Sequence, residues 1–302
     1  MVTRLVCPMA LAQLPCTLLV DNGSYRPQST LSLRRIAAGV TKETGHLIHP
    51  VSLLHSTKTN PEDLDGIPAE IFEPFLQKKR EEGIHSFMVL PLFFGHSAAI
   101  YEYLPQRVLE MQKDWPELEV RCAPCMVDIT SPDDTLVAEV LADLVRKKRD
   151  EEGLIKPAVT LVDHGTPRKF VNDVRNFLGM QLQTLLKDDF GAVEVSSMER
   201  REGEEYAFNE PLLENLLGSP GFEKEVILSM LFISPGRHAG PGGDIAEICE
   251  EAEKEKPGLK TYMSDLFATH EAVIPLLATR FRQGLETEAL TGEIPPPVMA
   301  VC

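Results

Sequence analysis

The 302-residue sequence is short of basic residues, of cysteine and of long apolar runs, and each shortage excludes a class of protein. Its 30 lysines and arginines face 46 aspartates and glutamates, which gives a net charge of −16. Such an acidic surplus argues against nucleic acid or an anionic membrane surface as the main partner. It also means that any anionic substrate has to meet a local group of basic side chains.

The six cysteines are scattered and form no dense framework: Cys7, Cys16, Cys122, Cys125, Cys249 and Cys302. This spacing favours a reducing compartment over a disulfide-rich secreted protein. No apolar run approaches the roughly 20 residues that a membrane-spanning helix needs. The first residues resemble neither a secretory signal nor a transit peptide. We therefore expect a cytoplasmic protein, or a plastid stromal one if a eukaryotic leader has been removed.

Two similar stretches follow each other along the chain. "LLVDNGS" around Asn22 matches "LVDHGT" around His164, and 164 − 22 = 142. "PLFFGHSAAI" around His96 matches "LFISPGRHAGPGGDI" around His238 at the same offset, since 238 − 96 = 142. Matches in the same order at one offset indicate a tandem duplication.

Two further matches support the duplication and give its boundaries. "PVSLLHS" matches "EVSSMER" and sets His55 against Glu199 at an offset of 144 (199 − 55), while "WPELEVRCAPC" matches "KPGLKTYMSDL". A charged stretch, 146–157, lies between the copies. We predict one half over 1–150 and a second half, with a C-terminal tail, over 151–302.

Each half alternates apolar strand patterns with helical patterns. Strands are predicted near 17–20, 47–54, 86–93 and 118–126, then 157–162, 191–198, 225–233 and 259–266; helices near 28–44, 67–83, 99–113 and 133–149, then 169–187, 205–217, 243–255 and 270–285. This order predicts an α/β fold of two similar domains, each a parallel sheet covered by helices. We expect the domains to face each other across a cleft in a monomer with an internal pseudo-twofold.

Polar residues gather where the predicted strands end. Ligands of such sheets bind beyond the carboxyl ends of the strands. The second half places His164, Glu199, His238 and His270 there, whereas the first half offers Asn22, His55 and His96. Neutral imidazoles with a carboxylate can hold Fe, Co, Ni or Zn, and an imidazole can equally accept protons near neutral pH. Donors drawn from separate strand ends suit a metal that passes through.

These residues carry a resemblance to a known family. "LLVDNGS" and "LVDHGT" resemble the first-strand signature of the sirohydrochlorin chelatases, the CbiX-like class II tetrapyrrole chelatases. "LFISPGRHAGPGGDI" resembles their second signature, and "FATHEAVIPLLATRF" resembles their closing stretch. The resemblance covers 16–150 and 157–285, nearly the whole chain.

The resemblance implies insertion of Co²⁺, Fe²⁺ or Ni²⁺ into sirohydrochlorin, for cobalamin or siroheme biosynthesis. The partners are then a small tetrapyrrole and a metal ion, and the metal is a substrate, so no permanently bound cofactor is expected. By motif position, His164 and His238 are the catalytic pair that handles the metal and accepts pyrrole protons. Glu199 is the supporting carboxylate, and His270 is an auxiliary residue of the substrate site.

Arginines near these motifs could supply the basic side chains that an anionic substrate needs in this acidic protein, because a guanidinium binds carboxylates bidentately. Arg237, beside His238, is the main candidate, and Arg168 and Arg200 are two more. From the first half, Asn22 and His96 are expected to complete the substrate site. Lys169 and Arg201 are equally consistent with ordinary surface charges.

The sequence departs from the family pattern in three places. The second signature carries extra residues, "AGPGG", and the stretch "RREGEEYAFNEPLLENLLGSPG" is expanded and acidic. Asn22 replaces the signature histidine in the first half, and an amide cannot accept a pyrrole proton. We therefore expect a degenerate site in the first half and the working site in the second.

Other functions remain open from the sequence. A chelatase-derived protein that binds metal or tetrapyrrole without catalysis is the main alternative. "SPGRHAGPGGDI" suggests a phosphate or nucleotide enzyme but lacks a P-loop and a GxGxxG motif. "DHG" resembles the histidine phosphatases, where Asp163 would repel phosphate. Cys122 and Cys125 lie on a predicted strand and are expected to be packing residues.

Overall fold

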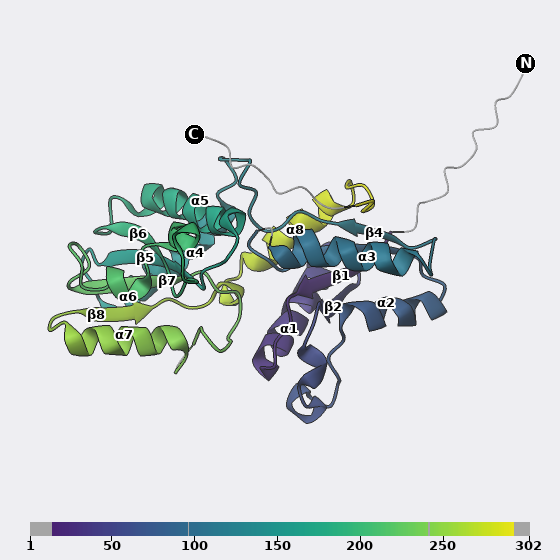
Figure 1. Ribbon diagram of the computed structural model, residues 1–302, viewed down its shortest axis with the longest axis horizontal. Coiled ribbons are helices and arrows are strands. Elements are labelled where there is room, and N and C mark those ends of the chain that lie inside the picture. Colours follow the sequence, from purple (N-terminus) through teal and green to yellow (C-terminus); the bar gives the residue numbers. More distant parts are fainter. Residues whose placement is uncertain (1–13, 96, 241, 293–302) are drawn as a thin grey trace, which may run out of the picture.

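Two parallel sheets form the frame of the protein (Figure 1). The computed structural model describes residues 14–95, 97–240 and 242–292. The first sheet holds β1 (Cys16–Asp21), β2 (Ile48–Ser52), β3 (Ser86–Pro91) and β4 (Glu119–Cys122) in the order β2-β1-β3-β4. The second holds β5 (Ala158–Asp163), β6 (Val193–Ser197), β7 (Glu225–Met230) and β8 (Lys260–Met263) in the order β6-β5-β7-β8. The predicted fold class is confirmed.

The central strands are buried on both faces, as their sequences require. Leu18, Leu19 and Val20 of β1 are 0% exposed, and so are Val159, Leu161 and Val162 of β5. Near-continuous apolar runs of this kind are typical of strands covered by helices on both sides.

The predicted helices form, with one exception. They are α1 (Pro27–Thr44), α2 (Phe72–Glu81), α3 (Leu104–Gln112), α4 (Leu136–Glu152), α5 (Lys169–Leu186), α6 (Leu213–Leu216), α7 (Asp244–Glu255) and α8 (Val273–Gly284). The helix predicted over 205–217 is wrong as a single element, because a 3₁₀ turn, η4 (Glu204–Asn209), precedes the short α6. Pro211 stands between them, and a proline lacks the N–H that a continuous helix needs while favouring an extended preceding residue.

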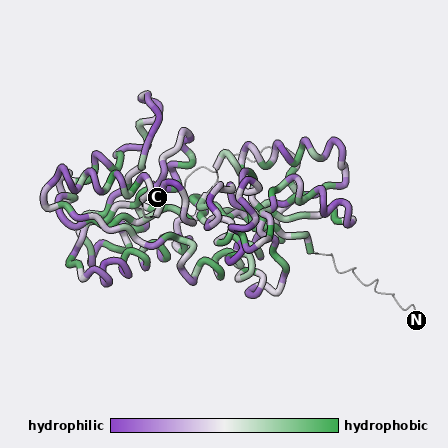
Figure 2. The backbone as a smooth tube through the Cα atoms, turned by 90° about the horizontal axis from the view of Figure 1, so that it is seen from below, coloured by the Kyte–Doolittle hydropathy of each residue, from purple (hydrophilic) through white to green (hydrophobic). Residues whose placement is uncertain are grey.

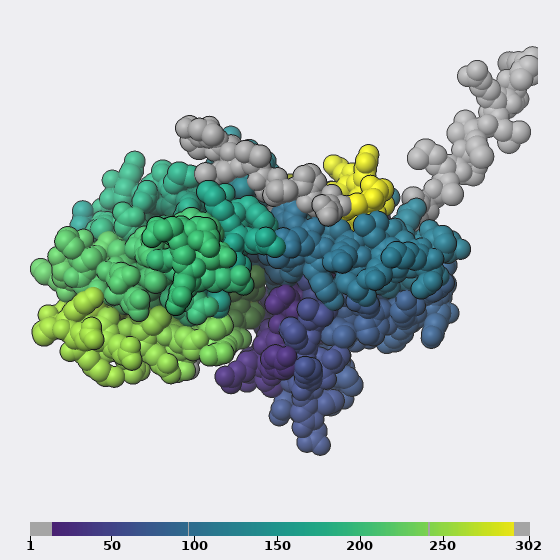
Figure 3. All heavy atoms as spheres, viewed as in Figure 1, coloured from purple at the N-terminus to yellow at the C-terminus, as the bar shows by residue number. Residues whose placement is uncertain are grey.

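The fourth helix of each half covers the sheet of the other half. Helix α4 packs on α5 and β7, whereas α8 packs on α1 and β3. Figure 1 shows α8, in yellow, lying among the first-half elements, and Figure 3 shows its end as yellow spheres on the same lobe. The halves are therefore interlocked, and the boundary at 150/151 stays a prediction about the duplicated sequence.

One apolar core runs through both halves as a result. It joins the α1/α8 face of the first sheet to the α4/α5 face of the second, with Ile36, Leu141, Leu178 and Leu277 among its members. Separate cores lie under α2 and α3 on one side and under α6 and α7 on the other. Figure 2 shows hydrophobic residues along the interior strands and hydrophilic ones around the periphery. In the described part of the chain, no helix combines the length and apolar character of a membrane span.

The strand registers give the equivalence of the two halves. Strands β3 and β7 begin 139 residues apart (225 − 86), so the loop that reaches His238 is longer by three residues (142 − 139) than the one that reaches His96. His96 itself lies outside the described residues. The pairing of His55 with Glu199 is wrong by one residue, because Leu54 N–H donates to the Asn22 carbonyl as Glu199 N–H donates to that of His164.

Candidate active site between the halves

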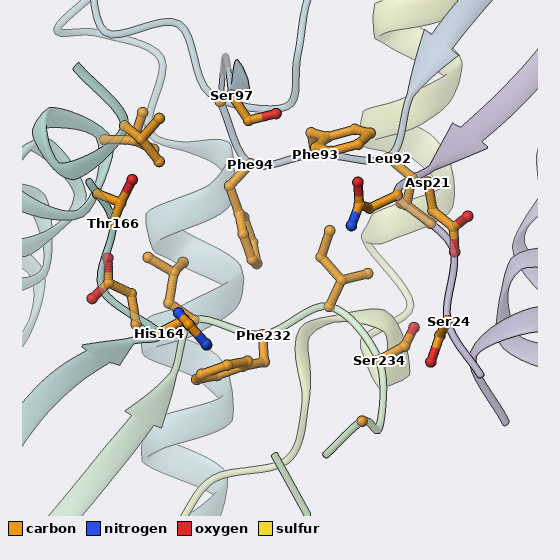
Figure 4. A pocket seen from close by; sticks show the side chains of 18 of the residues that line it. Asp21, Ser24, Leu92, Phe93, Phe94, Ser97, His164, Thr166, Phe232 and Ser234 are labelled. Carbon is orange, nitrogen blue, oxygen red and sulfur yellow. The ribbon is translucent and has the colours of Figure 1, made fainter. Parts of the chain in front are cut away.

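A cavity of about 480 Å³ opens between the two halves (Figure 4). Its size is within the roughly 300–1,000 Å³ typical of small-molecule sites. Four loops line it in equivalent pairs: 21–24 and 163–166 after the first strands, and the loops that follow β3 and β7. The cavity therefore lies where the carboxyl ends of both sheets meet.

Glycine fixes the two turns that follow the first strands. Gly23 and Gly165 have φ values of +87° and +88°, and a Cβ on either would lie 1.7 or 1.8 Å from the carbonyl oxygen of Leu54 or Glu199. No larger residue fits so close to that backbone. The turn thus presents the preceding residue, Asn22 in one half and His164 in the other, to the cavity.

The second-half turn brings two imidazoles together. The ring centroids of His164 and His238 are 4.5 Å apart, and the planes meet at 76°. Nδ1 of His238 lies 2.6 Å from Oδ2 of Asp244, and Nδ1 of His164 lies 3.0 Å from the Gly165 carbonyl oxygen. Since both partners are acceptors, they assign the proton of each neutral ring to Nδ1. Both rings then keep the lone pair of Nε2 for a proton or a metal.

Glu199 adds a carboxylate beside the pair. Its Oε1 is 3.6 Å from Nε2 of His164, too far for a direct hydrogen bond. The side chains of His164 and Glu199 are 44% and 63% exposed, so both reach solvent; His164 lines the cavity, and Glu199 lies beside it outside the lining. Among the described residues no group of three or more His, Cys, Asp or Glu could hold a metal ion.

Buried hydrogen bonds around Asp163 hold the turn that carries His164. Ser197 Oγ donates to Asp163 Oδ1 at 2.6 Å, and the Gly165 N–H donates to the same oxygen at 3.1 Å. Burial raises the pKa of the Asp163 carboxyl, while the Arg175 guanidinium, 3.9 Å away, opposes that rise. Burial also lowers the pKa of Arg175, which is 1% exposed.

The same network ties the acidic stretch to the turn. Asn209 accepts from the Thr166 N–H at 3.0 Å and donates to the Thr166 carbonyl at 2.9 Å. Arg175 donates to the carbonyls of Asn209 and Phe208. The 3₁₀ turn η4 is thereby fastened against the signature turn.

The arginines predicted to bind carboxylates lie outside the cavity lining. Each is paired with an acid: Arg168 with Glu102 at 2.9 Å, Arg200 with Glu210 at 2.7 Å, and Arg237 with Asp244 at 3.7 Å. Asn22 does line the cavity, as the first-half equivalent of His164. His96 cannot be placed, because it lies outside the described residues.

His270 does not join His164 and His238. It lines a separate cavity of about 190 Å³ between α4 and α8, with its Nε2 3.9 Å from Asp143. The 3₁₀ turn η5 (Phe267–Thr269) follows β8 and leads the chain toward the other half, which carries the imidazole away from the sheet edge.

The cysteine pair agrees with a packing role. Burial raises the pKa of the Cys122 thiol to about 12, and it raises the pKa of Cys125 well above its usual value. Thiols held neutral in this way are poor nucleophiles and poor metal ligands.

Sequence reasoning missed Asp244, Arg175 and Asn209 as parts of the site. Asp244 stands in the second signature as the "DI" dipeptide, six residues after His238, so its place was visible but its contact was not. Arg175 interrupts the apolar face of α5 where α1 has Leu33 (175 − 33 = 142). A cation on a buried helix face was the signal that could have marked it.

Comparison with solved structures identifies the fold. The structure is similar to SirB from Bacillus subtilis with Fe³⁺, with a TM-score of 0.62 and 13% identity over 89% of this chain and 95% of that one. It is also similar to the sirohydrochlorin chelatase SirB from Bacillus subtilis subspecies spizizenii in complex with cobalt, with a TM-score of 0.57 and 15% identity over 89% and 94%.

A third similar structure is DR2241 from Deinococcus radiodurans, a multi-domain protein described as similar to chelatases. Its TM-score is 0.56 and its identity 14%, over 90% of this chain and 56% of that one. No protein-family model matches the sequence, and no curated protein matches it. At these identities the likeness shows the fold alone, which is the fold that the sequence motifs predicted.

Proposed function

We propose that the chain, which has the fold of the sirohydrochlorin chelatases, inserts a divalent metal ion into a tetrapyrrole. Co²⁺, Fe²⁺ and Ni²⁺ are the candidate metals, since imidazole and carboxylate ligands suit all three. Sirohydrochlorin, on the way to siroheme or cobalamin, is the reference ring. The observation that carries the proposal is the contact between His238 and His164, which lines the cavity, with both Nδ1 atoms facing acceptors and both Nε2 lone pairs left for a proton or a metal.

Metal insertion needs two things that this pair offers. The two pyrrole N–H groups have to lose their protons, and the metal has to exchange water for ring nitrogens. A neutral imidazole whose Nε2 carries a lone pair can accept a proton or hold the ion during that exchange. Asp244, bonded to Nδ1 of His238, fixes the orientation and the tautomer of that ring.

Glu199 is proposed as the carboxylate that meets the incoming metal with His164. An ion about 2.1 Å from both Nε2 and Oε1 would subtend roughly 120° across their 3.6 Å separation, within reach of tetrahedral or trigonal geometry. A site with so few protein ligands holds the ion weakly. Weak binding suits a metal that is a substrate and has to leave for the ring.

The remaining residues are assigned around the ring. Asn22 is proposed to contact the macrocycle from the first half, and His96 is assigned there from the sequence alone. Arg168, Arg200 and Arg237 are proposed to meet ring carboxylates that project beyond the cavity mouth, by exchanging their present acidic partners. His270 lines the separate cavity between α4 and α8, so we propose no contact between it and the ring.

The test is the anaerobic rate of metal insertion, followed by absorbance, with sirohydrochlorin and Co²⁺, Fe²⁺ or Ni²⁺. The wild type is compared with a His164→Ala, His238→Ala double variant. His55→Ala is the matched control, because His55 is an exposed imidazole outside the cavity lining. We expect the wild type and the control to exceed the spontaneous rate and the double variant to equal it.

A wild type that binds metal or ring without accelerating insertion would overturn the proposal. The protein would then be a binding protein with a chelatase fold, the alternative raised by the degenerate first half.

A further inference from the structure

The wall of the cavity is largely apolar. Apolar side chains come from the loop after β3, the loop after β7 and the first turns of α5: Leu92, Phe93, Phe94, Leu231, Phe232, Ile233, Val171 and Val174. Figure 4 shows Phe94 reaching into the cavity from the first half and Phe232 lying beside His164. Flat aromatic and aliphatic walls suit the face of a planar conjugated ring.

The lining, as far as it is described, holds no lysine or arginine that is free to bind a ligand carboxylate. Among the described lining residues, Arg175 is the only lysine or arginine. A guanidinium has five N–H donors. In Arg175 these donate to Asn176, Ser197, Asn209 and Phe208, and the residue is 1% exposed. The donors of Arg175 are therefore occupied by protein acceptors and are not available to a ligand.

The carboxyl groups of the lining add no positive charge. Asp21 and Asp163 line it, and burial raises the pKa of both carboxyls. Arg168, Arg200 and Arg237 lie outside the lining and face acidic partners, so they could meet only carboxylates that project beyond the wall. The net charge of −16 adds a repulsive field over the whole molecule.

Apart from His164, the other polar side chains of the lining are hydroxyls and one amide. Ser97 Oγ is buried and has no hydrogen-bond partner within the described structure, and it is a labelled wall residue in Figure 4. Asn22, Ser24 and Ser29 lie at the first-half end. Hydroxyl and amide groups can satisfy a pyrrole N–H or one polar substituent, but they do not neutralise several carboxylates.

A carboxylate moved from water to such a wall loses its hydration and gains no cation. A ring with carboxylates around its whole edge has to place several of them there. We propose that this site selects a tetrapyrrole with few peripheral carboxylates, bound by its apolar face, in preference to a polycarboxylate ring such as sirohydrochlorin. The proposal rests on the function proposed above and concerns which ring that site takes.

The experiment measures binding without metal. Uroporphyrin, coproporphyrin and mesoporphyrin share one planar ring and carry progressively fewer carboxylates. Fluorescence anisotropy of each metal-free ring, titrated with the full-length protein, gives its Kd. We expect mesoporphyrin to bind at least about tenfold more tightly than uroporphyrin, with coproporphyrin between them.

Two charge variants distinguish binding in the cavity from nonspecific binding of apolar rings to the protein surface. Val171→Arg adds a cation to the cavity wall, and Met180→Arg adds the same charge at a residue of α5 that is 43% exposed. Val171→Arg should shrink or reverse the preference, whereas Met180→Arg should leave it as in the wild type. Thermal unfolding checks that both fold, and Ser29→Arg, at the equivalent turn of α1, replaces Val171→Arg if that variant does not.

The outcomes distinguish this inference from the function it rests on. Uroporphyrin bound most tightly, or equal shifts in both variants, would overturn the inference. So would the absence of binding to any ring. If mesoporphyrin is preferred and the cavity variant alone changes that order, the inference stands, even where no ring is metallated above the spontaneous rate. That last result would overturn the chelatase proposal instead.

Discussion

The two halves share a backbone frame and differ in what it carries. Both first-strand turns hold glycine at nearly the same φ, and in both the glycine N–H donates to the preceding aspartate at 3.1 Å. On that common turn stands Asn22 in one half and His164 in the other. The turn therefore forms without an imidazole. The fold therefore does not require His164, which agrees with the chemical role that we propose for it.

The residues that hold the two turns also differ, and again the second half carries the polar groups. Where α5 has Arg175, with its hydrogen bonds to the η4 turn, α1 has the buried Leu33. The buried Asp21 is bonded by Ser52 and Ser29 and has no arginine beside it. Among the described residues, the second half alone uses a buried arginine to hold a loop beside its first-strand turn.

Separating the first half from the second should cost the most stability. We expect a fragment of residues 14–156 to show no cooperative unfolding transition. It lacks α8, and its α4 would expose Val137, Leu141 and Leu144, which the second half covers. Circular dichroism during urea titration measures this. A cooperative transition of the fragment alone would contradict the interlocked arrangement.

Making the second half like the first should nearly abolish the proposed activity. His164→Asn removes one proton or metal acceptor, and we expect metal insertion to slow by about 10²–10⁴-fold. Asn22→Ala, at the equivalent position, should cost less than about tenfold and act on ring affinity. Steady-state kinetics of both variants make the comparison, and equal losses of kcat would mean that the halves contribute alike.

Arg175→Leu, which copies Leu33, should lower the free energy of unfolding at pH 7 by about 3 kcal/mol, because it leaves Asp163 and two carbonyls without their partner. Burial already raises the Asp163 pKa above 3.8, and removal of the guanidinium raises it further. A carboxyl whose pKa is raised in the folded protein lowers the stability as the pH rises from its unfolded-state pKa to its folded-state pKa. The deficit should therefore be full near neutrality and shrink toward pH 4.

Denaturant titrations at both pH values measure the deficit. Leu33→Met is the control and should cost less than about 1.5 kcal/mol at either pH, since it conserves volume in an apolar site. A loss for Arg175→Leu that is the same at pH 4 and pH 7 would show that Asp163 is not involved.

The smallest effect is expected for the carboxylate that holds His238. Asp244→Asn should slow metal insertion by about 10–100-fold, because the carboxylate partner of Nδ1 is lost. Glu247→Gln removes the same charge from the first turn of α7 and should leave the rate unchanged. The two rates, measured side by side, separate orientation of the imidazole from a general change in charge.

The sequence predicted the two parallel sheets well, because the apolar runs of β1 and β5 and the periodicity of α1 and α5 are local signals. It could not predict that α4 and α8 exchange places. An amphipathic stripe shows that a helix face is buried, but not which sheet buries it. The same gap explains His270, which was expected beside His164 and lies instead where α8 meets α4.

The chemistry of the site was partly visible. The strand-end rule brought His164 and His238 together in prediction, and the structure places their rings 4.5 Å apart. The one-residue shift between His55 and Glu199 could not be seen, because only the backbone hydrogen bonds fix that register. Arg175 and Asn209 act through carbonyls and a turn, and such contacts leave no spacing in the sequence.

The exchange of α4 and α8 has a consequence for synthesis on the ribosome. The first sheet receives its last covering helix from residues 273–284, near the end of the chain. Since chains emerge from the N-terminus, one face of the first sheet stays open to water and to other chains until residues 273–284 have been made. A nascent chain stalled anywhere before residue 273 is therefore expected to be a client of chaperones, however well its first 150 residues are made.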